Sequence, residues 1–223
     1  MRATEFLTEG RNHPVICVDV QPEYANYSGT NAAICEKIIQ FVAQQTGPVL
    51  MFVNAERDGM TNDTVADVVE YWNSTALGDE PYDYDEETDE YVERESPIEW
   101  NRFRITDKGY GWLRVWQDAR EHGIPITDAT IIRTIREMYQ QRVTDSRELF
   151  GGDAAQFQEW MGAAFEDLML DEGIQVMWTS VAQLKQFSGA YLVGGGRNEC
   201  LREVELLMNA FNIRYRRIDS LVY

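Results

Sequence analysis

The sequence predicts a single α/β domain, residues 1–223, built on a doubly wound and mainly parallel sheet. Three apolar runs of strand length carry this prediction, at residues 13–20, 49–53 and 190–193. An amphipathic helical pattern over residues 30–45 separates the first two runs, and glycines followed by a second helical pattern come after the third. The order strand, helix, strand at the start of the chain is typical of parallel strands joined by a right-handed crossover.

The first half of the chain supplies the expected strands and helices in order. The first strand leads into Asp19, and Pro22 prevents its continuation. The helix over 30–45 places Ile34 and Ile38 on one face, and the second strand follows at 49–53. A polar loop over 54–62 then precedes a short helix predicted over residues 64–72.

An acidic tract occupies residues 79–95 and contains ten carboxylates, one arginine and three tyrosines. We expect a solvent-exposed loop, because such charge density opposes burial. The alternative is a binding surface for a basic protein partner.

The second half is predicted to be mainly helical. Residues 100–106 suggest a third strand near a sheet edge, followed by a helix over 109–121. Asp128 begins another helix, and Asp153 with Gln156 resembles the capping box of a further one. Together they form a helical insert at about residues 124–171, which either caps a crevice or forms a subunit interface. We also expect the protein to be a homo-oligomer. Residues 174–178 suggest a strand or the start of the next helix, and residues 214–223 suggest a last strand at the sheet edge.

Composition excludes several function classes. The formal net charge of -18 disfavours nucleic acid and anionic membranes as partners. We find neither a signal peptide nor an apolar run long enough to cross a bilayer, and therefore expect a cytoplasmic protein. The three cysteines and two histidines lack metal-ligand spacing, so we expect no disulfide framework, no metal and no cofactor.

Three polar residues stand where strands are expected to end. Asp19 follows the first strand, Lys108 follows the third, and Cys200 lies in the first turn of the helix after the glycines, with Asn198 as its predicted N-cap. The helix dipole and Arg197 favour the thiolate of Cys200. Because strand ends converge at one edge of a doubly wound sheet, these groups can meet as a nucleophile with a base.

Two segments resemble the isochorismatase-like cysteine hydrolases, which include nicotinamidases. They are VICVDVQPEY, in which Asp19 and Gln21 match an Asp-x-Gln motif, and YLVGGGRNECLREVELLMNAF, in which Gly194 and Cys200 match a Gly-x-x-x-x-x-Cys motif. The resemblance implies a three-layer α/β fold in which Asp19 acts as the base, Cys200 attacks an amide-like carbonyl and Lys108 assists. It also implies an oxyanion hole of backbone N–H groups near Gly196 and Cys200.

The leading hypothesis is therefore a cysteine-dependent hydrolase of a small amide-like or related carbonyl compound. We expect its substrate-binding residues to be Gln21, Tyr24, Gly196 and Arg197. One alternative is a catalytically inactive relative that binds another protein through the acidic tract or the helical insert. Another is a metal-dependent nuclease using Asp19 with Glu23 or Asp58. A purely structural role is also open, in which Cys200 is an apolar core residue and Asp19 caps the next element.

Overall fold

The computed structural model describes residues 12–54, 63–78, 82–85, 89–107, 126–143 and 167–223. The chain divides into two compact units. The first unit comprises Met1–Thr106, Ala190–Gly195 and Arg216–Tyr223, and the second comprises Asp107–Gly189 and Gly196–Tyr215. The assignment of residues 1–223 to one domain stays a prediction.

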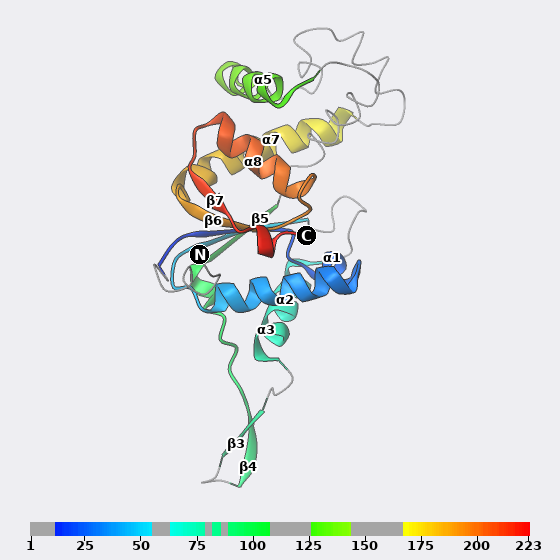
Figure 1. Cartoon of the computed structure of the whole chain (residues 1–223), viewed down its shortest axis with the longest axis vertical. Helices are drawn as coiled ribbons and strands as arrows, with labels where there is room; N and C mark the ends of the chain where they lie inside the picture. The colour runs from blue at the N-terminus through cyan, green and yellow to red at the C-terminus, as the bar shows by residue number, and fades with distance from the viewer. Residues whose placement is uncertain (1–11, 55–62, 79–81, 86–88, 108–125, 144–166) are drawn as a thin grey trace. The chain divides into compact units, whose positions relative to one another are not determined.

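The first unit is built around a five-stranded sheet with the strand order β5-β2-β1-β6-β7 (Figure 1). Its strands are β1 (Val15–Val18), β2 (Val49–Val53), β5 (Phe103–Asp107), β6 (Ala190–Gly194) and β7 (Tyr215–Arg217). β1 pairs in parallel with both neighbours, so that Cys17 lies opposite Met51 on one side and Val193 on the other. The predicted α/β class with a mainly parallel sheet is confirmed, and so is the edge position of the strand after residue 100.

Three helices of this unit connect and cover the strands. They are α1 (Pro22–Asn26), α2 (Gly29–Ala43) and α3 (Val65–Leu77). The N-termini of α2 and α3 are capped by side chains. Ser28 accepts a hydrogen bond from the Asn31 N–H, and Thr64 forms a reciprocal capping box with Asp67. α2 and α3 lie on the same face of the sheet (Figure 1).

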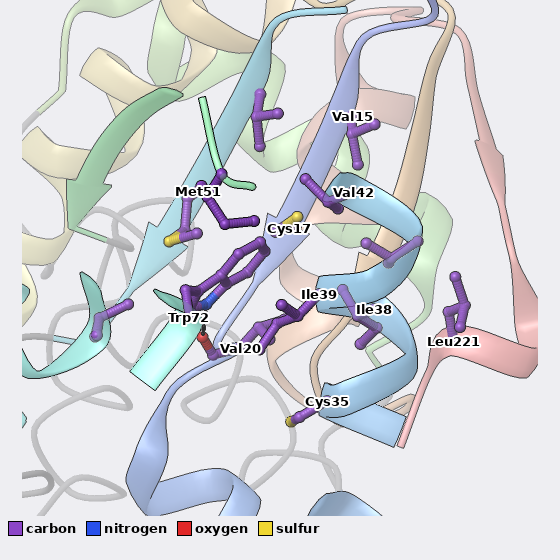
Figure 2. Packing of buried hydrophobic residues seen from close by; sticks show 14 of the residues in the cluster. Val15, Cys17, Val20, Cys35, Ile38, Ile39, Val42, Met51, Trp72 and Leu221 are labelled. Atoms are coloured by element: carbon purple, nitrogen blue, oxygen red, sulfur yellow. Dashed lines mark hydrogen bonds between the residues drawn. The ribbon is translucent and has the colours of Figure 1, made fainter. Parts of the chain in front are cut away.

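The core on this face lies between the sheet and the two helices (Figure 2). Alternate residues of β1 and β2 point into it, and Trp72 of α3 is its largest fully buried side chain. The intervening residues of both strands are buried as well, as expected for parallel strands that read as continuous apolar runs.

β6 approaches β1 so closely that only glycine fits at position 194. Gly194 has φ +80, and a Cβ there would lie 2.4 Å from the carbonyl oxygen of Val18. The first of the three glycines is therefore required by strand packing as well as by backbone conformation.

Arg102 ties the start of β5 to the end of α2. It belongs to the 3-10 helix η3 (Trp100–Arg102), and its guanidinium donates to the carbonyls of Gly47 at 2.7 Å and Val42 at 3.1 Å. A cation near these carbonyls also complements the negative end of the α2 dipole.

The acidic tract contains a β-hairpin where a loop was predicted. β3 (Tyr82–Asp85) pairs antiparallel with β4 (Glu90–Glu93), placing Tyr84 opposite Tyr91. The loop prediction was wrong for these two strands. Solvent exposure is confirmed for the described side chains of the tract except Asp85, which is half-buried.

The second unit contains three described helices, α5 (Asp128–Gln141), α7 (Asp167–Gln186) and α8 (Cys200–Ala210). Two arginines join α5 to α8: Arg136 donates to the carbonyl of Ala210, and Arg202 bonds the carboxylate of Asp128. The ring of Tyr139 contacts those of Trp178 and Phe211, with centroids 5.4 and 4.8 Å apart. These contacts link all three helices.

Several predicted boundaries change in the second half. The helix from Asp128 is confirmed, whereas residues 174–178 lie inside α7 and do not form a strand. The last strand is limited to β7, and η6 (Asp219–Leu221) follows it. The helix over 109–121, Asp153 and Gln156 lie outside the described residues.

Candidate functional site

The end of β1 holds a buried carboxylate in an unusual backbone conformation. Asp19 follows the strand directly, is 1% exposed and has φ +52, in the left-handed region. This region is uncommon for residues other than glycine, although aspartate and asparagine enter it more readily than most.

Hydrogen bonds from remote parts of the chain fix this conformation. The Asp19 N–H donates to the carbonyl of Phe52 at 2.9 Å, and the hydroxyl of Tyr223 donates to the Asp19 carbonyl. The indole N–H of Trp72 donates to the next carbonyl, that of Val20, at 2.8 Å (Figure 2). A left-handed non-glycine residue persists when its surroundings determine it in this way, and such residues are concentrated at functional sites.

Gln21 connects the ends of β1 and β2. Its side chain is fully buried, with Oε1 accepting from the Asn54 N–H at 2.9 Å and Nε2 donating to the Asn54 carbonyl at 3.0 Å. Nε2 also donates to the carboxylate of Asp63 at 3.0 Å. Both amide hydrogens of Gln21 are thus engaged within the chain, while its predicted contact with a substrate stays a prediction.

Two polar residues at this edge were missed in the sequence. The Asn54 amide donates to the hydroxyl of Tyr24 at 2.6 Å, and the carboxylate of Asp63 accepts from the Glu23 N–H at 2.9 Å. Asn54 follows β2 as Asp19 follows β1, so the rule that strand ends converge could have identified it. Asp63 directly precedes Thr64, the N-cap of α3, and carries no such signal.

Cys200 is the first residue of α8 and is partly exposed. A turn precedes it, in which the Gly196 carbonyl accepts from the N–H groups of Glu199 at 3.0 Å and Leu201 at 3.2 Å. The predicted position in the first helical turn is confirmed, but the N-cap is Glu199, without a side-chain cap bond, and not Asn198. Arg197 is exposed in this turn.

The other two cysteines have a different environment. Cys17 and Cys35 are buried, and burial raises the pKa of both thiols, that of Cys35 to about 12. At neutral pH they are therefore protonated core residues, and among the three cysteines only Cys200 is partly exposed.

The predicted site residues fall into separate groups. Asp19, Gln21 and Tyr24 lie together at the carboxyl end of β1, whereas Gly196, Arg197 and Cys200 lie in the second unit. Lys108 is outside the described residues, as is Asp58. The predicted meeting of the carboxylate, the amine and the thiol therefore stays a prediction. Within the described ranges, no three histidine, cysteine, aspartate or glutamate side chains gather as metal ligands.

Neither a family model nor a curated protein matches the chain. Among the described helices, none is long and apolar enough to cross a membrane.

Proposed function

We propose that this chain is a cysteine-dependent hydrolase of a small amide-like or related carbonyl compound, with the three-layer isochorismatase-like fold that its two motifs resemble. The observation that carries the proposal is the state of Asp19, a buried carboxylate held in the left-handed region at the end of a central parallel strand. Ligand crevices of open α/β sheets lie at this edge.

The carboxylate of Asp19 supplies the proton acceptor that the proposed reaction needs. An aspartate that served only the backbone conformation could be replaced by glycine, which adopts it without steric penalty and buries no charge.

The position of Cys200 supports its proposed role as the nucleophile. A thiol at the first position of a helix is exposed to the positive end of the helix dipole, which favours the thiolate. The two buried cysteines lack such a position.

The proposed reaction has two steps. Asp19 accepts the thiol proton while the Cys200 sulfur forms a bond to the carbonyl carbon, and the C–N bond then breaks as the leaving amine takes up a proton. Water hydrolyses the resulting thioester, releasing the acid and restoring the thiol. Lys108 assists the proton transfer, and N–H groups near Gly196 and Cys200 stabilise the oxyanion.

Alkylation by iodoacetamide at pH 7, mapped by mass spectrometry, tests the proposal. Cys200 should react faster than an ordinary thiol, and Asp19→Asn should slow it because asparagine tolerates the same backbone but cannot take up the proton. Glu70→Gln is the control, since it neutralises an exposed carboxylate of α3 that belongs to no part of the candidate site.

A panel of small primary amides then tests turnover in the wild-type protein and three variants. We expect product formation to be lost in Cys200→Ser and in Asp19→Asn, and to be retained in Glu70→Gln. Labelling of Cys200 at the rate of a free thiol, unchanged by Asp19→Asn, would exclude this mechanism.

A further inference from the structure

The β3–β4 hairpin presents three tyrosines on one face. Because alternate residues share a face and Tyr84 is paired with Tyr91, Tyr82, Tyr84 and Tyr91 lie on the same side of the ribbon. These residues, here called the tyrosine face, are 56%, 51% and 76% exposed. Such a cluster of exposed rings differs from the scattered apolar residues of an ordinary surface.

Local contacts hold the tyrosine face in shape. The rings of Tyr84 and Tyr91 meet edge to face, with centroids 5.4 Å apart and planes at 60°. The Tyr84 hydroxyl donates to the carboxylate of Asp89, which raises the pKa of Tyr84 and keeps it neutral. On the other face, Asp83 pairs with Arg94 at 3.5 Å. The rings are therefore preorganised for a partner that stacks on aromatic surfaces.

Charge selects the kind of partner. The tract over residues 79–95 carries ten acidic residues and one arginine, a formal charge of -9 that is half of the -18 of the whole chain. A second copy of the hairpin would be repelled, and charged side chains along exposed strands oppose indiscriminate edge pairing. A cationic partner is attracted instead.

We propose that the tyrosine face binds an arginine-rich segment of a partner protein. Guanidinium groups stack on tyrosine rings and form bidentate ion pairs with carboxylates, so one arginine can use both features of the hairpin. Lysine forms the ion pairs but stacks less well, and an arginine segment should therefore bind more tightly than a lysine segment of equal charge. This surface is independent of the proposed hydrolase chemistry.

Fluorescence anisotropy of labelled octa-arginine and octa-lysine peptides with the full chain tests the proposal. The double variant Tyr84→Ser/Tyr91→Ser removes two rings without changing charge, and should weaken octa-arginine binding by about fivefold or more, from about 0.5–1 kcal/mol per exposed cation–π contact. Tyr27→Ser is the control, because Tyr27 is 83% exposed and lies outside the hairpin.

A second pair of variants separates the effect of charge on the hairpin from the effect of the net charge of the whole chain. Glu93→Gln removes one charge at the position paired with Tyr82 and leaves the rings, whereas Glu70→Gln removes one exposed charge from α3. The hairpin variant should weaken binding more than the helix variant. Equal effects of these two variants, equal affinities for the two peptides, or full binding by the tyrosine double variant would each overturn the proposal, because attraction by net charge alone would then explain the result.

Discussion

Replacing Trp72 by phenylalanine tests the hydrogen bond that links α3 to the chain segment directly after β1. Trp72 is fully buried, and its indole N–H donates to the Val20 carbonyl at 2.8 Å. The substitution removes a donor from a buried carbonyl at a cost of about 1–3 kcal/mol. The smaller ring adds about 1 kcal/mol for the volume left empty. We therefore expect the free energy of unfolding to fall by about 2–4 kcal/mol.

Urea unfolding followed by far-ultraviolet circular dichroism measures this loss. With an m-value of about 1–3 kcal/mol/M, the midpoint should move down by about 0.7 M or more. Trp100→Phe is the matched control: the Trp100 indole donates at 2.9 Å to the Asn73 side chain, whose oxygen keeps a second donor in Ser96. Its loss should stay below about 1 kcal/mol. Equal losses in the two variants would refute the importance of the bond to Val20.

Three further predictions concern stability. Gly194→Ala should lower the free energy of unfolding by more than about 2 kcal/mol, because Cβ meets backbone at 2.4 Å, whereas Gly29→Ala, with nothing within 4 Å, should change it by less than about 0.5 kcal/mol. Arg102→Met should lower the free energy of unfolding by about 2 kcal/mol, because two hydrogen bonds to backbone carbonyls are lost. Arg94→Met removes only an exposed ion pair and should lower it by less than about 0.5 kcal/mol. Chemical denaturation measures the glycine pair and the arginine pair. Burial raises the pKa of Cys35 from 9.0 to about 12, so stability present below pH 9 should decline between pH 9 and 12, and Cys35→Ala should reduce that decline.

The sequence predicts the central strands well because their physical signal is local. β1 and β2 are buried along their length and β6 at every residue except the half-buried Tyr191, and each therefore appears as an unbroken apolar run. Their parallel pairing follows from the intervening helix, since two strands with such a connection do not form a hairpin. The start of α3 was also predictable, because Thr64 and Asp67 form a capping box.

The hairpin was missed because charge concealed its periodicity. Tyr82, Asp83, Tyr84 and Asp85 alternate with the period of a strand, but the excess of carboxylates favoured a loop. Residues 174–178 of α7 show the opposite problem: they are mostly apolar and equally compatible with a strand or a helix. A short apolar run does not distinguish the two when no turn residue interrupts it.

The state of Asp19 depends on contacts that no local pattern reveals. Its position after a buried strand is visible in the sequence, but the groups that fix the backbone come from Phe52, Trp72 and Tyr223. The capping alternative does not explain it, because the N-cap of α1 is Gln21. Glycine would satisfy the backbone without burying a charge. Asp19→Asn, and not a truncation, is therefore the variant that tests the proposed base, because asparagine tolerates the same backbone conformation.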